Sequence, residues 1–401
     1  MELFKTNEYM NILFVAPMPV VASRGGIQRV SDILAKEFIA LGNQTYFLCR
    51  REEHLIKENV FSAPQFYIPI ENDISKSIDD YLLLLSRLHI EVVIFQWIDH
   101  LIYHWLKNTP KEIKVISTIH HQPFQGIGYE RAIAKWSNPI NFKMKCWKYL
   151  GVVFPFIHRY INVRIERNEL AGMLPYVDRI CFLSERFIPR VRKYMPLIDV
   201  HKLCGINNPL SVITRDCFNI EEKENLILFV GRIANASKNV YQFINVWQNF
   251  SELHPDWRAI VIGDGPDLQS CKKYVERKSV KRIRFEGYCS NPSLFYRRAK
   301  AICITSYAEG FSMVLVESMQ YGCVPFVYDT YEALRDIVAN NVTGYISSAF
   351  DTNDMVTKIS AIADNEENYR KIVPQIINST ERFQASEIAK KWLTLIRSIK
   401  K

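Results

Sequence analysis

Short, mostly apolar runs alternate with amphipathic stretches along the whole chain. In the first half, runs of four to six residues predict buried β-strands, because strands covered on both faces of a sheet are apolar throughout. These runs are residues 11–16, 44–49, 92–95, 115–119 and 179–183. Apolar side chains recur every three or four residues from Val30 to Leu41, which predicts a helix. Strands separated by helices are typical of a parallel, doubly wound α/β sheet.

A second series of apolar runs follows Asn207–Leu210. Its predicted strands are residues 226–230, 257–262, 283–285, 301–304 and 324–328. The polar stretch 214–225 reads as a surface linker region, so we place a domain boundary near residues 206–212. The sequence therefore predicts two doubly wound, Rossmann-like domains of similar size, whose strands point their carboxyl ends at a cleft between the domains. They comprise residues 1–207 and 208–385, and a last helix over residues 386–401 packs back on the first domain.

Length and composition agree with a folded two-domain protein. The chain has 401 residues, of which 48% are hydrophobic and 23% charged, and this composition excludes a disordered or low-complexity protein. Its nine cysteines include no C-x-x-C pair, which predicts reduced thiols in a cytoplasmic protein rather than a zinc site or a disulfide framework. The longest apolar stretch, Tyr149–Ile157, is about half as long as a transmembrane helix needs to be.

Positive charge is concentrated in residues 131–193, which we call the basic-aromatic segment. It holds 13 Lys and Arg against 4 Asp and Glu, and so accounts for the whole net charge of +9. It also holds the aromatic residues Phe142, Trp147, Tyr149, Phe154, Phe156 and Tyr160. Interleaved cations and aromatic rings suit an anionic membrane surface, and we predict peripheral binding there. The alternatives are a solvated face on an ordinary helix pair, or nucleic acid, for which no known binding module is present.

Glycines and basic residues follow the predicted strands at several places. Gly25 and Gly26 precede the first helix, where free N–H groups can meet a phosphate, although a simple tight turn explains them as well. Arg232 and Lys238 share one loop after the first strand of the second domain and can hold a diphosphate between them, unless they are ordinary surface charges. Gly263 opens a Gly-Asp-Gly-Pro turn, which is a weak signal alone.

Two carboxylates bracket the segment Glu309–Glu317. Glu309 lies on a predicted loop, and Glu317 about two turns into the following helix. Each carboxylate can accept two hydrogen bonds from a vicinal diol, so one can hold a sugar and the other a ribose. A solvated helix face is the alternative for Glu317, but apolar neighbours surround it in the sequence.

A further candidate, His120, ends the predicted strand 115–119. In α/β domains the carboxyl ends of strands line the ligand cleft, so His120 is expected to face the ligand. A purely structural histidine is the alternative reading, and His121 fits the expected register less well than His120 does.

Taken in order, these motifs resemble those of the retaining glycosyltransferase family four, which has the GT-B fold. The resemblance covers residues 11–344 and implies catalytic roles for His120, Glu309, Arg232 and Lys238. It implies donor contacts at Gly25, Gly26, Arg232, Lys238, Gly263, Gly287, Tyr288, Glu309, Phe311, Ser312, Met313 and Glu317. Arg232 and Lys238 would bind the diphosphate, Glu317 the ribose, Glu309 and the Phe311–Met313 backbone the sugar, and Gly287–Tyr288 would lie near the base.

Three departures from the family pattern concern specificity. Ser312 stands where the family often has glycine, and His121 where it often has an acidic or amide residue. Residues 330–332 replace a glycine- or proline-containing stretch. These positions are expected near the sugar and the acceptor, so the resemblance implies less about specificity than about the fold.

The resemblance implies a retaining transfer of a sugar from a nucleotide-diphosphate donor to an acceptor hydroxyl. We expect a UDP-sugar, with a GDP-sugar as the second choice, and a lipid-linked saccharide acceptor in bacterial surface polysaccharide assembly. No metal or cofactor is expected, because two cations and a helix N-terminus can stabilise the leaving diphosphate. The alternatives are a nucleotide-sugar epimerase of GT-B fold and a non-catalytic nucleotide-sugar-binding protein. We expect the protein on the cytoplasmic face of the membrane.

Overall fold

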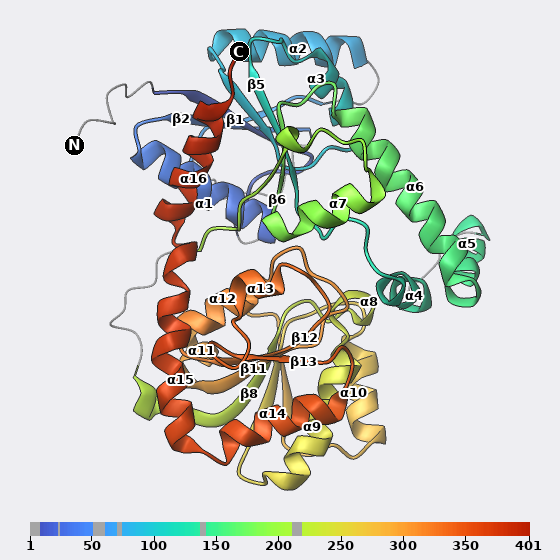
Figure 1. Ribbon diagram of the computed structural model, residues 1–401, viewed down its shortest axis with the longest axis vertical. Helices are drawn as coiled ribbons and strands as arrows, with labels where there is room; N and C mark the ends of the chain where they lie inside the picture. The colour runs from blue at the N-terminus through green and yellow to red at the C-terminus, as the bar shows by residue number, and fades with distance from the viewer. Residues whose placement is uncertain (1–8, 23–24, 51–60, 70–73, 137–141, 211–218) are drawn as a thin grey trace. The chain divides into compact units, whose positions relative to one another are not determined.

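The computed structural model describes residues 9–22, 25–50, 61–69, 74–136, 142–210 and 219–401 (Figure 1). The chain divides into two compact units. Unit 1 takes its residues from 1–121, 167–211 and 383–401, and unit 2 from 122–166 and 212–382. The predicted linker 214–225 lies partly outside the described residues. The domain boundaries drawn from the sequence stay predictions, and each unit is described by itself below.

Unit 1 is built on one parallel sheet with the strand order β3-β2-β1-β4-β5-β6-β7. The strands are β1 (Asn11–Ala16), β2 (Gln44–Cys49), β3 (Gln65–Tyr67), β4 (Val92–Phe95), β5 (Lys114–Ile119), β6 (Arg179–Phe182) and β7 (Leu203–Gly205). The five strands predicted from the sequence are confirmed to within one residue. The two missed strands, β3 and β7, have three residues each, too few for an apolar run to stand out.

Helices cover both faces of this sheet. They are α1 (Gly26–Ala40), α2 (Ile74–Arg87), α3 (Ile102–Asn108), the C-terminal part of α6 (Pro155–Met173), α7 (Ile188–Tyr194) and α16 (Ala385–Ser398). Aromatic rings fill the core between the layers: Phe14 of β1 stacks on Phe38 of α1 with ring centroids 6.0 Å apart. On α2 and α3, Tyr81 stacks on Trp105 at 5.4 Å.

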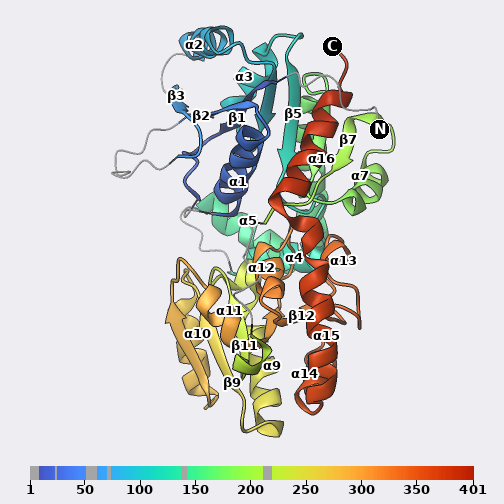
Figure 2. The ribbon, with the colours of Figure 1, turned by 90° about the vertical axis from the view of Figure 1, so that its left-hand side faces the viewer.

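Helix α16 is an integral part of unit 1, although the chain reaches it only after finishing unit 2. It packs beside α1 (Figure 2) and buries Ile388, Trp392 and Ile396. Lys114 of β5 donates a hydrogen bond to the Ile396 carbonyl oxygen at 3.1 Å, and the Leu210 N–H donates to the Phe383 carbonyl at 2.8 Å. The first and last parts of the chain therefore share one core.

Unit 2 contains a six-stranded parallel sheet with the strand order β10-β9-β8-β11-β12-β13. The strands are β8 (Glu224–Val230), β9 (Arg258–Ile262), β10 (Ile283–Gly287), β11 (Ala299–Ile304), β12 (Val324–Tyr328) and β13 (Tyr345–Ser347). All five predicted strands are confirmed to within two residues, and only the short β13 was missed. Both sheets have the strand order of a doubly wound fold, which confirms the predicted fold class.

The helices of unit 2 vary widely in length. They are α4 (Ile127–Trp136), α5 (Phe142–Val153), α8 (Asn235–Lys238), α9 (Val240–Leu253), α10 (Leu268–Arg277), α11 (Ser293–Arg298), α12 (Met313–Gln320), α13 (Leu334–Ile337), α14 (Thr352–Ala363) and α15 (Glu366–Ser379). The apolar side of α9 is buried and contains Phe243, Trp247 and Phe250. Helices α14 and α9 pack on each other.

Three neighbouring strands of unit 2 end at glycines. Gly231, Gly263 and Gly287 come at the carboxyl ends of β8, β9 and β10, and all three have positive φ. The Gly263 N–H donates to the Gly287 carbonyl at 2.7 Å. A Cβ atom on Gly263 would lie 1.8 Å from the Gly231 carbonyl oxygen, whereas one on Gly287 would meet nothing within 4 Å. Close approach of two backbones therefore requires glycine at position 263.

We expect Gly263→Ala to destabilise the protein much more than Gly287→Ala does. The first change adds a backbone clash to backbone strain, and these cost about 1–3 kcal/mol each, so we expect a loss of about 3 kcal/mol or more. The second adds only the cost of a left-handed backbone, about 1–2 kcal/mol. Thermal and urea unfolding midpoints measure both, and equal midpoints for the two variants would contradict the close approach.

Candidate functional site

The candidate donor site lies where the strand order of the unit 2 sheet reverses direction. Connections from β8 lead to one side of the sheet and connections from β11 to the other, so the loops after these two strands diverge. Ligands of open α/β sheets bind in the crevice formed at such a point, outside the carboxyl ends of the strands. The loop after β8 leads into α8, and the loop after β11 leads into α12.

Two predicted site residues form an ion pair at this point. Lys238 Nζ lies 2.6 Å from Glu309 Oε1. Ser306 Oγ donates to the same oxygen, also at 2.6 Å. The Glu309 side chain is only 12% exposed, so these two hydrogen bonds compensate the burial of its charge. Within the described part of the chain, Glu309 Oε2 accepts no hydrogen bond and remains available to a sugar hydroxyl.

The backbone beneath Lys238 is held by the next strand. Asn239, between α8 and α9, has a left-handed backbone with φ 52°, a conformation that asparagine tolerates better than most residues. Thr305 Oγ1 lies 3.1 Å from the carbonyl oxygens of both Lys238 and Asn239. The Tyr307 N–H donates to the Ser237 carbonyl at 2.9 Å. The β11 loop therefore fixes both members of the ion pair.

Helix α12 begins at Met313, so Glu317 lies one turn into the helix rather than two as the sequence suggested. The residues before it, Phe311 and Ser312, are buried, and Glu317 is half-buried. Tyr331 packs nearby: burial raises the pKa of its hydroxyl well above the usual range, and the Glu309 carboxylate adds to that shift. The phenol therefore stays protonated beside the carboxylate.

Arg232 differs from Lys238 in having no anionic partner among the residues that the structure describes. Its side chain is exposed, and it forms no ion pair with any residue that the structure describes. An uncompensated guanidinium next to a glycine-rich strand end suits a phosphate. Tyr288, predicted near the base, is 67% exposed and follows Gly287.

In unit 1, His120 lies directly after β5 and contacts Gln96, which lies directly after β4. The two side chains meet at 2.6 Å, between His120 Nε2 and Gln96 Oε1. Burial lowers the pKa of His120 to about 3, and the neighbouring His121 contributes to the shift. His120 is therefore neutral at physiological pH. Gly25 and Gly26 stand at the N-terminus of α1, whose first turn holds no acidic residue.

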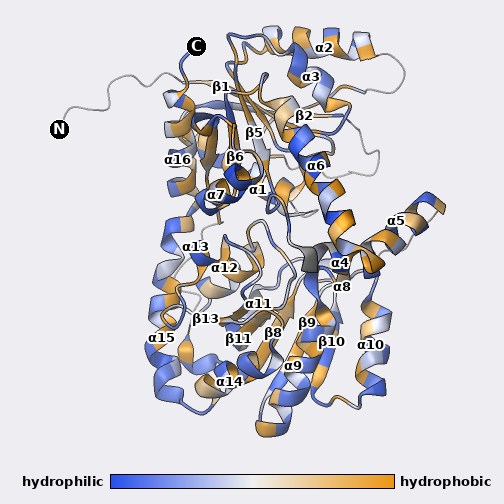
Figure 3. Cartoon of the chain, turned by 45° about the vertical axis from the view of Figure 1, so that its right-hand side comes forward, coloured by the Kyte–Doolittle hydropathy of each residue, from blue (hydrophilic) through white to orange (hydrophobic). Residues whose placement is uncertain are grey.

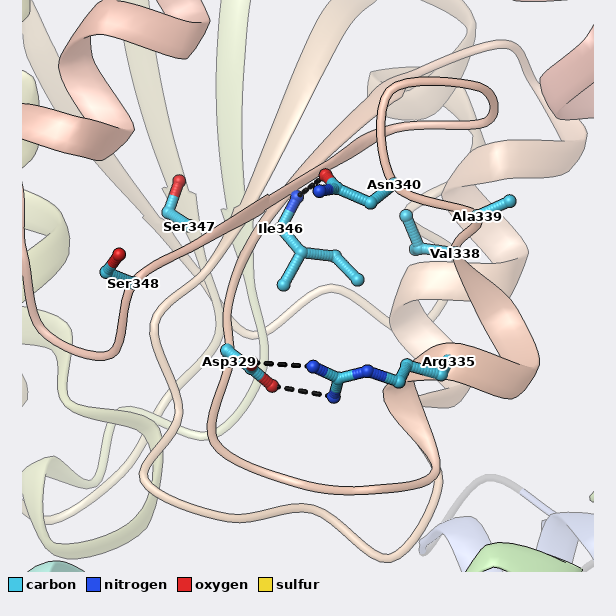
Figure 4. Close-up of a pocket in the computed structure, with 8 residues that line it drawn as sticks. All are labelled: Asp329, Arg335, Val338, Ala339, Asn340, Ile346, Ser347 and Ser348. Atoms are coloured by element: carbon cyan, nitrogen blue, oxygen red, sulfur yellow. Dashed lines mark hydrogen bonds and ion pairs between the residues drawn. The ribbon is translucent and has the colours of Figure 1, made fainter.

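A pocket of about 430 Å³ lies over β12 and β13 of unit 2 (Figure 4). Asp329 and Arg335 face each other across it and form a double hydrogen bond at 2.8 and 2.7 Å. Asn340 Oδ1 accepts from the Ile346 N–H at 2.8 Å. Because the two charges neutralise each other, this pocket offers no free cation to a diphosphate. The site at β8 and β11 also holds an ion pair, but it adds Arg232, which pairs with no described residue, so it is the better candidate.

The basic-aromatic segment exposes many large apolar side chains, and along α5 hydrophobic and hydrophilic residues alternate (Figure 3). They are Phe142, Met144, Trp147, Tyr149, Val153, Phe154, Phe156, Ile157, Tyr160, Ile165 and Tyr176. A hollow of about 380 Å³ lies among Arg131 and the apolar residues 152–157. Residues 137–141 of the segment lie outside the described structure. Among the described helices, none is both long and apolar enough to span a membrane.

The second half of the chain matches a known protein family. Residues 213–378 match the family described as glycosyl transferases group 1. These residues contain the ion pair, the three glycines and helix α12. This part of the chain is similar to the group 1 glycosyltransferases. The recognition made from the sequence motifs is thereby confirmed.

Curated proteins similar to this chain include bacterial glycosyltransferases named for lipid-linked saccharides or lipopolysaccharide. One, from Campylobacter jejuni, is named GalNAc-alpha-(1->4)-GalNAc-alpha-(1->3)-diNAcBac-PP-undecaprenol alpha-1,4-N-acetyl-D-galactosaminyltransferase; it is 26% identical over 67% of this chain and 68% of its own length. Another is the lipopolysaccharide 1,6-galactosyltransferase of Salmonella typhimurium, 26% identical over 46% of this chain and 52% of its own. The match thus spans only about half of the second relative.

Solved structures confirm the GT-B fold of this chain over nearly its whole length. The lipopolysaccharide outer core galactosyltransferase WaaB superposes with a TM-score of 0.66 at 18% identity, covering 97% of this chain and 99% of its own. Anabaena HepE in complex with UDP superposes with a TM-score of 0.72 at 12% identity, covering 98% and 100%. At these identities the likeness shows the fold alone.

The structure places some of the predicted site residues in contact with one another and adds further residues to the site. It brings Lys238 to Glu309, and Gly263 to Gly287, whereas His120, Gly25 and Gly26 belong to the other unit. Sequence reasoning missed the residues that hold these groups, namely Ser306, Thr305 and Gln96. Ser306 and Thr305 directly follow β11, and Gln96 directly follows β4, so a polar residue immediately after a buried strand was the available signal. The site assignments themselves stay predictions.

Proposed function

We propose that the glycosyltransferase moves a sugar from a nucleotide diphosphate to an acceptor hydroxyl with retention of the anomeric configuration. The observation that carries this proposal is the Lys238–Glu309 pair, held by Ser306 and Thr305 at the switch point of unit 2. It combines a cation for the diphosphate with a carboxylate that keeps one oxygen available for the sugar. A nucleotide-diphosphate sugar needs the cation for its diphosphate and the carboxylate for its sugar.

The leaving diphosphate gains negative charge as the bond to the sugar breaks, and Arg232 and Lys238 would stabilise that charge. A cation that contacts the diphosphate more strongly in the transition state than in the ground state raises turnover. We propose that no metal is needed, since these two side chains can supply the positive charge. The departing phosphate oxygen can then take the proton of the acceptor hydroxyl on the same face, which gives retention.

We propose a UDP-sugar as donor, with a GDP-sugar as the second possibility. HepE has been crystallised with UDP and with UDP-glucose, and this similarity of fold supports the uracil base. The acceptor is proposed to be a lipid-linked saccharide, because the Campylobacter jejuni relative is named for one with undecaprenol. The exposed apolar side chains of the basic-aromatic segment give independent support.

Radiolabelled UDP- and GDP-sugars, incubated with and without bacterial membrane lipid extract, test the proposal. We expect transfer of label to lipid only when extract is present, and an NMR spectrum of the product with the anomeric configuration of the donor. Conversion of the donor sugar without extract would instead indicate an epimerase. Donor binding without any conversion would indicate a non-catalytic protein.

Two lysine variants control this assay. Lys238→Ala should abolish most turnover. Lys300→Ala removes a comparable ion pair, to Glu366 at 2.7 Å, from the amino end of β11. Since Lys300 lies at the opposite end of the strand, its loss should leave turnover unchanged. Equal activity of the two variants would remove Lys238 from the site.

Glu317→Gln should weaken donor binding while the fold survives, because it removes the charge of a proposed ribose ligand and changes little volume. A hydrogen bond to a charged group is worth about 1.5–3 kcal/mol, so we expect roughly a 10- to 100-fold loss of kcat/KM. Steady-state kinetics with varied donor measure the loss. Unchanged kinetics in a folded variant would show that Glu317 does not touch the donor.

We propose that the basic-aromatic segment holds the protein on the cytoplasmic face of an anionic membrane. Lys143 and Lys145 are exposed on α5 among the exposed rings of Phe142 and Trp147. Apolar side chains that water surrounds gain by entering the headgroup region, and each nearby cation adds about 1 kcal/mol.

Changing Lys143, Lys145 and Lys148 to Glu should release the protein from anionic vesicles, as measured by sedimentation at low salt. Raising the salt to 1 M should release wild type as well, because the Debye length falls from about 10 Å at 0.1 M to about 3 Å. Changing Lys272, Lys273 and Lys278 to Glu alters the net charge equally on another surface, and that variant should still sediment. Failure of wild type to sediment would refute membrane binding by this segment.

A further inference from the structure

Gln96 lies at the carboxyl edge of the unit 1 sheet. It directly follows β4, and its neighbour β1 leads into α1, so Gln96 stands at the switch point of this sheet. Its side chain is only 1% exposed. In buried amide side chains both the oxygen and the nitrogen are normally hydrogen-bonded. The partners of the Gln96 oxygen and nitrogen therefore indicate what this side chain does.

The contact between Gln96 and His120 determines which ring nitrogen carries the proton. Gln96 Oε1 is a carbonyl oxygen and can only accept, so His120 Nε2, 2.6 Å away, must donate. Neutral imidazole carries a single N–H. His120 is neutral at physiological pH, as shown above, so its Nδ1 bears a lone pair. No described residue donates a hydrogen bond to that Nδ1.

The amide nitrogen of Gln96 forms no hydrogen bond with any described residue. This Nε2 atom is buried, and Thr118 Oγ1 is likewise buried with no hydrogen-bond partner among the described residues. Phe95 and Ser117 are paired in register on β4 and β5, so Gln96 and Thr118 are neighbours at the carboxyl edge. At this edge the Gln96 amide nitrogen is buried, and the imidazole Nδ1 of His120 is the acceptor left for a ligand. A hydroxyl group can donate a hydrogen bond to such an acceptor.

We propose that Gln96 is a positioning residue, which holds His120 as its Nε2–H tautomer so that Nδ1 can accept a hydrogen bond from a sugar hydroxyl of the substrate. The sugar as ligand rests on the proposed function, but the tautomer does not. His120 with the proton on Nδ1 would offer that hydroxyl a donor in place of an acceptor, and the hydroxyl proton would lose its partner.

The tautomer is measured directly by ¹H–¹⁵N NMR of the ligand-free full chain, labelled at histidine nitrogens. His120 signals are assigned by their disappearance in His120→Asn. In wild type we expect a one-bond cross-peak from a slowly exchanging proton on Nε2, and an unprotonated Nδ1. A proton on Nδ1 would overturn the proposal whatever the enzyme transfers.

Three variants separate positioning from a structural role. Gln96→Leu keeps the volume but removes the acceptor, so the Nε2–H cross-peak should vanish through exchange with water. Gln96→Glu keeps an acceptor oxygen, and the cross-peak should persist. Gln65→Leu is the matched control: it removes another glutamine of unit 1, which accepts from the Val20 N–H at 2.8 Å, and should leave the His120 signals unchanged.

Measurements of turnover test whether the His120 tautomer matters for sugar transfer. Gln96→Leu should lower kcat by about tenfold, the order of effect expected from the loss of one substrate hydrogen bond, with donor KM little changed. Gln65→Leu should keep wild-type kcat. A persistent cross-peak in a folded Gln96→Leu variant would overturn the positioning role. A lost cross-peak with unchanged kcat would overturn its relevance to transfer.

Discussion

Parallel strand pairing is the constraint on which the rest of this structure depends. Every named strand in both sheets runs parallel to its neighbours, so all carboxyl ends of a sheet meet at one edge. Loops that leave this edge at the switch point diverge and leave backbone groups open to a ligand. The predicted site residues of unit 2 come from segments more than 70 residues apart, and parallel pairing alone brings Lys238 to Glu309.

Burial of charge explains why the site contains residues that support the Glu309 carboxylate in addition to those proposed to contact the donor. A carboxylate that is largely removed from water needs both a counter-ion and hydrogen bonds, and Glu309 has Lys238 and Ser306. Lys238 in turn sits on a left-handed turn that Thr305 holds. The result is a charge pair whose geometry is set before any ligand arrives, so little reorganisation is needed when a diphosphate binds.

The sequence predicted the fold well because apolar runs report directly on burial. Ten strands were found from such runs, and the three that were missed have three residues each. Site residues were found where a motif spans neighbouring positions, as in Glu309–Glu317. Gln96 escaped because its role comes from a contact with a residue of another loop, and periodicity carries no information about such contacts. Ser306 contacts Glu309 three residues later within one loop, where no periodic pattern marks which side chains meet. The start of α12 was misjudged for a related reason: Phe311 and Ser312 are buried by tertiary packing without being helical.

The position of α16 has a consequence for synthesis of the protein. Unit 1 takes its first strands from the beginning of the chain, but its core also needs Ile388, Trp392 and Ile396. Domains usually fold in order as they leave the ribosome. Here the continuous segment that forms most of unit 2 emerges complete while the unit 1 sheet still has an uncovered apolar face against α1. The first unit begun is therefore the last to be finished.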